Sequence, residues 1–535
     1  MADRLAEGRA GPTSEALRPS IWLPVHPSRL AAWGGSLWVR FALVAAMGVV
    51  FLVQLPVLDH YFFGDDFVPL ADIASRSSAR YVKEAFLLED VTPNWRFLTS
   101  LFYLGTYRAF GLDAFPFMLA SVLVHTGTAA LTFRLVRRVT DEVWPAFLAA
   151  ALFGLSAAHV PTVGQVTAFN NVLAAFLLML SLVTLYEGLV GERLRWWLLV
   201  SIAAFAGAIA ANDSAAVLAP VPAALVLWQV ARVDGWWRDR RRLRKLALLS
   251  APYALIGGAA LIGFAACRCT EAANAGLYGA GDHLIANLFV YLGRLLYPIG
   301  MEAPGHVGAA HLAGGVAVGV VAIAALARGP ALARITVLFL LLALLPYLPL
   351  QFALAPRYVY LAAIPFSILA ALLFVEAARY GSRVAPVLPG ALVLVALGVL
   401  GLHGWQSVEQ NRTFAAKTDD WRALATGLER RYPDLAEGSK VYVRGGPLTS
   451  AIWQFYVLPA VGETLWGGVT IQAVAEEEER FCVLPTGGDL LVVDFDGGRF
   501  TPVVVTTEAE APAATADAQR PAVAVTCPPP APFPP

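Results

Sequence analysis

Long apolar runs recur along most of this chain and constrain its fold more than any other feature. Each is close to the roughly 20 residues that cross a bilayer as a helix. Of the 535 residues, 58% are hydrophobic and only 15% are charged, whereas a soluble domain holds about a quarter charged residues. This composition excludes an ordinary soluble enzyme. The runs lie at about residues 37–58, 113–133, 144–158, 170–186, 196–211, 215–231, 246–267, 308–327, 335–351, 358–377 and 385–404. The sequence therefore predicts a mainly α fold, a polytopic membrane helical bundle with about eleven spans.

Basic loops support this count independently. Short cytoplasmic loops of membrane proteins are enriched in Arg and Lys. The basic loops of this chain fall on alternate sides if the N-terminus is cytoplasmic, and they are Arg134–Arg138, Arg193–Arg195, Arg232–Lys245, Arg328–Arg334 and Arg379–Arg383. Lys and Arg total 39 and so do Asp and Glu, so no excess of positive charge points to a nucleic acid partner. We expect a cytoplasmic N-terminus and look for chemistry in the loops on the opposite side.

The chain divides into four predicted regions. Residues 1–35 are polar and form a cytoplasmic segment, and residues 36–405 form the membrane domain with an external loop at 59–112. Residues 406–505 combine a helical stretch with β-like runs between Gly-Gly turns, which indicates a small extracytoplasmic α/β domain. Residues 506–535 are rich in Ala, Pro and Thr, which is typical of a disordered tail. The four cysteines show no metal-binding spacing.

Two adjacent carboxylates, Asp65 and Asp66, follow directly after the first predicted span. Ionisable groups near a membrane are costly and usually have a partner or a task. A crowded carboxylate pair suits a general base or an all-oxygen metal site. The alternative is that both residues are solvated or cap a helix at Val68–Ala74. A second short helix is expected at Ala79–Leu88, so that the loop covers the membrane domain rather than extending freely.

Further motifs follow in a fixed order along the chain. Gly64-Asp65-Asp66-Phe67 precedes Asn94-Trp95-Arg96-Phe97-Leu98, Val122-Leu123-Val124-His125, Ala150 to Leu155 with His159, and finally Arg357-Tyr358-Val359-Tyr360-Leu361. Together they resemble membrane glycosyltransferases of the GT-C superfamily, in particular protein O-mannosyltransferase-like and tetratricopeptide-containing mannosyltransferase-like chains. The tetratricopeptide repeats are absent. Pro161 and Asn171 stand where the family often carries acidic residues.

This resemblance implies an enzyme that takes a sugar from a polyprenyl-phosphate carrier on the outer face of the membrane and passes it to a hydroxyl of a protein or glycan. In that reading Asp65 is the general base and Asp66 is the second candidate. Arg96, Arg357 and Tyr358 bind the donor phosphate, because a guanidinium matches phosphate oxygens in a bidentate way. The implied location is the inner membrane of a bacterium. No cofactor is required, and a divalent metal, if one is used, would bind Asp65 and Asp66.

Three residues are possible pocket residues, each with a structural alternative. His125 lies inside a span, where a hydrogen bond between helices explains it as well as catalysis does. His159 ends the third span on the outer side and is either a ligand contact or an interfacial residue. Asp213 lies at an external turn and is also a candidate helix cap. Tyr358 has the alternative of an aromatic anchor at the interface.

Two other function classes remain open from the sequence: a carrier or flippase for a lipid-linked glycan, and a non-catalytic assembly protein of the cell envelope. A transporter places its site near the midplane, whereas the polar residues here gather on one side. Asp65 follows the first span and Arg357 opens the tenth. The topology therefore predicts that both lie at one boundary, and they share a pocket if the first and tenth spans pack close together.

Overall fold

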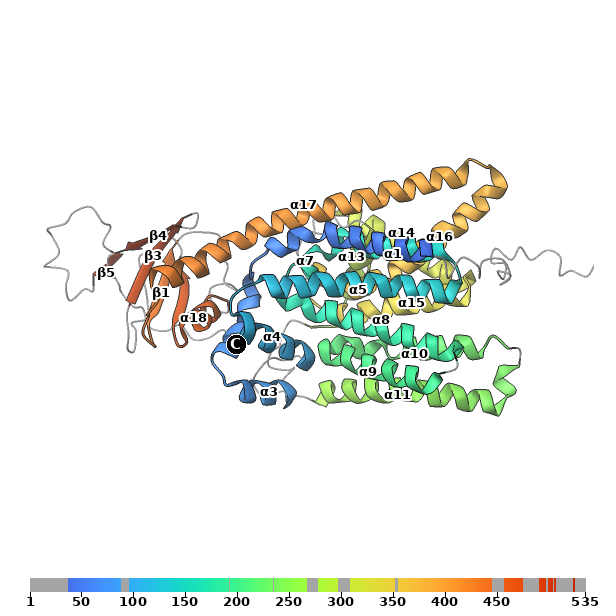
Figure 1. The fold of residues 1–535 in the computed structure, drawn as a ribbon, viewed down its shortest axis with the longest axis horizontal. Helices are drawn as coiled ribbons and strands as arrows, with labels where there is room; N and C mark the ends of the chain where they lie inside the picture. The colour runs from blue at the N-terminus through green and yellow to red at the C-terminus, as the bar shows by residue number, and fades with distance from the viewer. Residues whose placement is uncertain are drawn as a thin grey trace, which may run out of the picture.

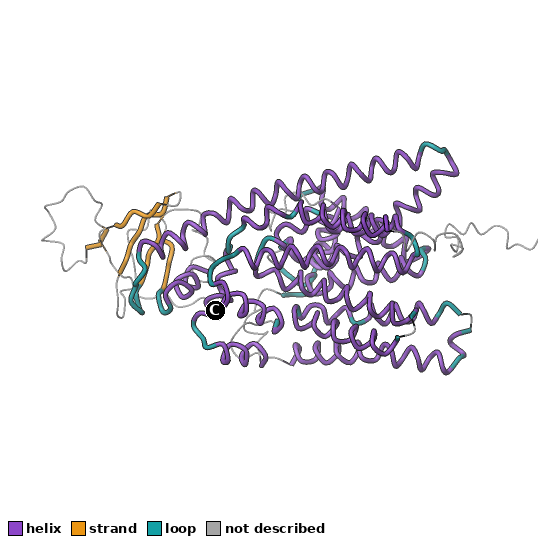
Figure 2. The backbone as a smooth tube through the Cα atoms, viewed as in Figure 1, coloured by secondary structure: helices purple, strands orange, loops and turns teal. Residues whose placement is uncertain are grey.

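The structure is a computed structural model in which most of the chain is helical (Figures 1 and 2). It describes residues 37–87, 96–191, 193–233, 235–266, 278–296, 308–351, 355–444, 457–474, 490–496, 499–503, 505–506 and 523–524. The predicted cytoplasmic segment 1–35, the four cysteines and most of the tail 506–535 lie outside these residues.

The helices that form the bundle and its loops occur in the following order. They are α1 (Leu37–Val53), α2 (Phe67–Ala74), α3 (Ser78–Leu87), α4 (Phe97–Phe110), α5 (Phe115–Thr140), α6 (Val143–Leu155), α7 (Val160–Val163), α8 (Phe169–Val190), α9 (Leu194–Ala211), α10 (Pro220–Val230), α11 (Arg240–Ala266), α13 (His283–Leu296), α14 (Ala309–Arg328), α15 (Ala331–Leu344), α16 (Tyr360–Val384) and α17 (Leu388–Arg431). Short 3-10 turns connect several of them: η2 (Leu55–Asp59), η3 (Gly64–Asp66), η4 (Ala157–His159), η5 (Val166–Ala168), η6 (Asp213–Leu218), η7 (Trp236–Arg238), η8 (Leu345–Tyr347) and η9 (Pro356–Val359).

Each of the eleven predicted spans corresponds to a helix, but not all are long enough to cross a bilayer alone. Within the described residues, nine helices have the length and apolar composition of a span. The predicted span at 144–158 is bent by 45° where α6 gives way to the segment Ala157–Val163. The predicted span at 335–351 is a shorter apolar helix, Ala331–Tyr347. The polytopic helical fold is thus confirmed, and the count of eleven stays a prediction.

Two of the predicted cytoplasmic loops meet at one end of the bundle. Arg134 and Arg138 on α5 both donate to Glu187 on α8, at 3.0 Å and 2.9 Å. Arg379 on α16 forms an ion pair with Glu142, directly before α6. The loops at 134–138 and 379–383 are therefore neighbours in space, as the alternation of basic loops requires.

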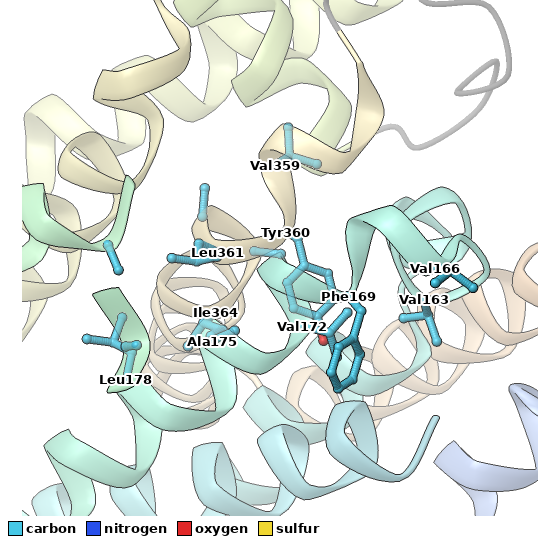
Figure 3. Close-up of a cluster of buried hydrophobic side chains, with 14 of the residues drawn as sticks. Val163, Val166, Phe169, Val172, Ala175, Leu178, Val359, Tyr360, Leu361 and Ile364 are labelled. Atoms are coloured by element: carbon cyan, nitrogen blue, oxygen red, sulfur yellow. The ribbon is translucent and has the colours of Figure 1, made fainter. Parts of the chain in front are cut away.

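A buried apolar cluster joins α8 to α16 beneath the opposite end (Figure 3). Phe169 and Val172 from α8 meet Tyr360 and Ile364 from α16, and all four are at most 3% exposed. Close packing of this kind fixes backbone positions, because interiors are packed as densely as organic crystals. The cluster thereby holds the loop before α8 and the turn before α16 in a constant relative position.

Helix α17 runs without a break from the last predicted span into the C-terminal part, so the predicted boundary between residues 405 and 406 falls inside a helix of 44 residues. Figure 1 shows it extending along the bundle to the β-strands. One face of α17 contacts the segment between α1 and α2 through side chains at helical spacing. The contact residues on α17 are Ser407, Asn411, Phe414, Thr418 and Trp421.

The C-terminal part contains the small α/β unit that the sequence predicts. Its strands are β1 (Lys440–Arg444), β2 (Thr470–Val474), β3 (Leu490–Asp496) and β4 (Arg499–Val503), with α18 (Leu458–Trp466) between β1 and β2, and with the two-residue strands β5 (Val505–Thr506) and β6 (Val523–Ala524) beyond them. The sheet order is β2-β1-β3-β4, with β1 parallel to both neighbours and β4 antiparallel to β3. On α18, Thr464 donates to the carbonyl of Phe67 on α2 at 3.4 Å, so this unit lies over the first external loop.

Candidate active site

A cavity of about 460 Å³ opens where the first external loop meets the ends of several bundle helices. This volume is within the range of roughly 300–1,000 Å³ that is usual for ligand sites. Five of the residues predicted from the sequence line it, namely Asp65, Arg96, Asp213, Arg357 and Tyr358. The prediction that short helices α2 and α3 lie in the external loop is also confirmed, and Val68 and Tyr81 from these helices line the same cavity.

One wall depends on residues 163–167, which we call the cradle segment. Each of its five residues is hydrogen-bonded to another part of the chain. The pairs are Ser121 Oγ to the Val163 carbonyl (2.8 Å), His60 Nδ1 with the Gly164 carbonyl (3.0 Å), Gln165 Nε2 to Asp65 Oδ1 (2.6 Å), Tyr103 Oη to the Val166 carbonyl (2.7 Å), and Thr167 N to Asp66 Oδ1 (2.7 Å). A side chain at Gly164 would have no room, because an added Cβ would lie 2.5 Å from His60 Nδ1.

The cradle segment gives the two adjacent carboxylates different surroundings. Asp66 is fully buried and accepts three hydrogen bonds, two on Oδ1 from the backbone and hydroxyl of Thr167 and one on Oδ2 from Phe63 N. Asp65 has 37% of its side chain exposed and lines the cavity, which Asp66 does not. The prediction of Asp66 as the second base is therefore corrected: it is enclosed and fixes the turn at the start of α2. Asp65 alone of the pair faces the cavity.

Burial governs the ionisation of Asp66. Its pKa is raised to about 7, first by burial and second by the nearby charge of Asp65, while the donors from Thr167 and Phe63 oppose the shift. Burial also raises the pKa of Asp72 to about 6, against the influence of Arg76, whose Nη1 lies 3.3 Å from Asp72 Oδ1.

Arg357 and Tyr358 form the opposite wall. Arg357 Nη1 donates to Asp65 Oδ2 at 3.4 Å, and 29% of the arginine side chain is exposed. Tyr358 stacks on Tyr347, with ring centroids 4.5 Å apart and an angle of 14° between the planes. The guanidinium carbon of Arg357 lies 5.8 Å from the centre of the Tyr358 ring. A cation held against aromatic faces at a cavity wall is suited to an anionic group.

A second arginine lies elsewhere in the same cavity. The buried Nε of the Arg96 side chain has no hydrogen-bond partner among the residues that the structure describes. Arg96 interacts electrostatically with Asp213, which also lines the cavity. Asp213 accepts from Ser214 N at 2.9 Å, but the cap of η6 is Asn212. The alternative reading of Asp213 as the helix cap is thus wrong.

The two predicted pocket histidines do not line this cavity. His125 is fully buried, with Nδ1 2.8 Å from the Tyr360 hydroxyl and Nε2 3.1 Å from the Gly154 carbonyl. His159 is also fully buried, and its ring centre lies 5.2 Å from that of His125. Both therefore belong to the packing between α5, η4 and α16, and their prediction as pocket residues is corrected. For His125 the alternative of a bond between helices is the one that the structure shows.

Several residues that line the cavity or lie behind its wall were not found from the sequence. Gln165 and Thr167 contact the carboxylates, and Asn171 links Asn212 (3.0 Å) and Tyr347 (3.4 Å) along the wall. Their only sequence signal is the polar character of a short stretch between two spans. In the part of the chain that the structure describes, no group of three or more His, Cys, Asp and Glu side chains could hold a metal ion. A divalent metal at Asp65 and Asp66 therefore stays a prediction.

The chain is similar in structure to ArnT from Cupriavidus metallidurans, solved in the apo state and bound to undecaprenyl phosphate, with a TM-score of 0.45 in both cases and 15% and 16% identity. These matches cover 82% of this chain and 86% of ArnT. It is also similar to the oligosaccharyltransferase of Archaeoglobus fulgidus, with a TM-score of 0.44 and 12% identity over 83% of this chain. The match spans only 65% of that longer protein. No protein-family model and no curated protein sequence matches the chain.

Proposed function

We propose that this chain is an integral-membrane glycosyltransferase of the GT-C type, which moves a sugar from a polyprenyl-phosphate donor to a hydroxyl acceptor on the outer face of the membrane. Asp65 is the general base, and Arg357, Tyr358 and Arg96 bind the donor phosphate. The acceptor is a hydroxyl of a protein or glycan. The similar structures include one bound to undecaprenyl phosphate and one named an oligosaccharyltransferase, and the proposal assigns this chain the same class of donor.

The observation that carries the proposal is the contact of Asp65 with Arg357 inside a cavity. One carboxylate and one guanidinium meet at 3.4 Å, and both are partly exposed to the same space. The distance is at the long end of hydrogen bonding, and both groups are open to a ligand in the cavity. Transfer from a phosphate carrier needs both groups: a cation for the leaving phosphate and a base for the attacking hydroxyl.

The pair also explains how the base becomes active. When the donor phosphate binds Arg357, it competes with Asp65 for the same guanidinium. Asp65 Oδ2 then loses its partner and is free to meet the acceptor hydroxyl. The base is thereby released only when the donor is present.

The reaction balances with these groups alone. The acceptor oxygen forms a bond to the anomeric carbon of the sugar while the bond from that carbon to the phosphate oxygen breaks. The phosphate oxygen keeps the electron pair, and Arg357 and Arg96 stabilise its charge. Asp65 Oδ2 takes the proton from the acceptor hydroxyl.

The carrier alternative fits the structure less well. Its site would lie near the midplane of the bundle. The described cavity instead lies at one end, beneath α2 and beside the unit that contains α18. The assembly-protein alternative offers no reason for two arginines and three aspartates to line one cavity.

The test uses a strain that lacks this chain. Its surface glycans and glycoproteins are compared with those of the parent by mass spectrometry, and the full chain or the Asp65→Asn variant is restored. We expect one sugar to be missing, to return with the full chain, and to stay missing with the variant at equal expression. Return of the sugar with the variant would overturn the proposal, and loss of lipid-linked glycan export would favour the carrier.

A further inference from the structure

Asp65 is held from two sides, and the two contacts differ in kind. On Oδ2 it meets Arg357 at 3.4 Å, and on Oδ1 it accepts from Gln165 Nε2 at 2.6 Å. The first contact faces the cavity, where a phosphate competes for the cation. The second contact lies behind the cavity wall, because Gln165 is only 9% exposed and does not line the cavity.

We propose that Gln165 is a positioning residue, which holds the Asp65 carboxylate in place after the donor phosphate has taken Arg357. This inference rests on the proposed function, because it assigns a role within that reaction. With Oδ1 occupied by the Gln165 amide, the free oxygen is Oδ2. The base therefore presents Oδ2 alone to the acceptor, whereas a freely rotating carboxylate would present either oxygen.

The position of Gln165 is itself fixed by its neighbours in the cradle segment. The Val163 carbonyl accepts a hydrogen bond from Ser121, and the Val166 carbonyl accepts one from Tyr103. The Gly164 carbonyl is hydrogen-bonded to His60. Thr167 binds the adjacent Asp66. A side chain supported in this way keeps its geometry when its partner changes, which is what a preorganised site requires.

Gln165 restricts the rotation of the Asp65 carboxylate. Without the amide, fewer orientations of the carboxylate present Oδ2 to the acceptor, so turnover should fall while donor binding is kept. A fall in kcat without a change in KM is a readout that a merely structural role of Gln165 would not produce.

The experiment compares the full-length chain in lipid nanodiscs with Gln165→Leu, which keeps bulk but removes the donor, and with Gln165→Glu, which keeps shape but adds a like charge. Transfer assays with a polyprenyl-phosphate sugar give kcat and KM, and a double-mutant cycle of Gln165→Leu with Asp65→Asn, read from Tm, measures the coupling of the two side chains. Gln229→Leu is the matched control, because it makes the same change on α10 at a residue that does not line the cavity.

We expect Gln165→Leu to lower kcat at least tenfold while KM for the polyprenyl-phosphate donor changes less than twofold, and Gln165→Glu, which repels Asp65, to lower kcat further. Gln229→Leu should keep the wild-type values. The cycle should show coupling between Gln165 and Asp65, because each loses its partner when the other is changed. Additive effects on Tm, or a wild-type kcat in folded Gln165→Leu, would overturn the inference. If the wild type transferred no sugar at all, the proposed function would fail, and the cycle would still decide the contact between Gln165 and Asp65.

Discussion

Asp65 and Arg357 are 292 positions apart, yet Arg357 Nη1 lies 3.4 Å from Asp65 Oδ2. The topology explains the approach, because Asp65 follows α1 and η2 while Arg357 lies in η9, directly before α16. Span order predicts only that both lie at one membrane boundary, and the structure shows that they contact each other in one cavity. Both side chains line one cavity. Substitution of one residue leaves the other in place, so their roles can be tested separately.

Changes at these two residues should impair different steps. Asp65→Asn preserves shape and removes the base, so kcat should fall by roughly 10²- to 10⁴-fold with donor affinity nearly intact. Arg357→Ala should weaken donor binding as well, and Arg357→Lys should restore it only in part, because the bidentate fork is lost. Steady-state kinetics with a defined polyprenyl-phosphate sugar measure both effects.

The alternative for Arg357 is an anchor at the lipid headgroups, which a lysine would fill equally well. Full activity of Arg357→Lys would therefore rule out the phosphate role. Near-normal transfer by Asp65→Asn would likewise rule out the base.

The membrane topology gives a second prediction. If the chain has eleven spans with a cytoplasmic N-terminus, reporter fusions after Ser382, at the end of α16, and after Gly438, beyond α17, should report opposite compartments. The basic loop at 379–383 belongs to the cytoplasmic side and the sheet to the outer side. The same compartment for both fusions would refute the predicted single crossing of the membrane between Ser382 and Gly438.

The sequence predicts the elements of this protein better than it predicts their contacts. Apolar runs of bilayer length locate the helices, because the membrane requires nearly continuous hydrophobicity. The division of Asp65 from Asp66 was not predictable, since adjacent residues carry the same chemical signal and only the cradle segment gives them different surroundings. Gln165 was missed for a similar reason, because nothing in the sequence indicates that a glutamine 100 positions from Asp65 contacts it. The predicted boundary at residue 405 falls inside α17, because helical propensity continues across the change from apolar to polar residues.

The ionisation of Asp66 predicts a pH dependence of stability. Its pKa is raised to about 7 in the folded chain, against about 3.8 when unfolded. The folded state thus binds a proton more tightly, so this group stabilises the fold at low pH and the contribution is lost as pH rises through about 7. We expect the Tm in detergent to rise as pH falls from 8 to 5.

Asp66→Asn provides the control for that experiment. The amide cannot ionise, so the part of the pH dependence that Asp66 supplies should vanish. It cannot accept all three bonds from Thr167 and Phe63, so Tm should be lower at every pH, by the equivalent of about 1–3 kcal/mol for one unsatisfied buried donor. An unchanged pH dependence in this variant would show that another group is responsible.

The last prediction concerns the contact of α17 with the segment that carries the carboxylates. Trp421 is 4% exposed, and its ring centre lies 6.2 Å from that of Phe63 and 5.8 Å from that of Phe67, on either side of Asp65 and Asp66. Trp421→Ala should remove about 3–5 kcal/mol of stability, as is usual for a buried aromatic residue. It should also lower kcat, because the segment holding the base loses its support. Trp405 is a matched control on the same helix, with 65% of its surface exposed, and Trp405→Ala should leave both Tm and kcat nearly unchanged. If Trp421→Ala lowered Tm but left kcat at the wild-type value below the unfolding temperature, α17 would serve only to attach the C-terminal unit. A loss of kcat in the folded variant would instead show that the packing of α17 maintains the geometry of Asp65.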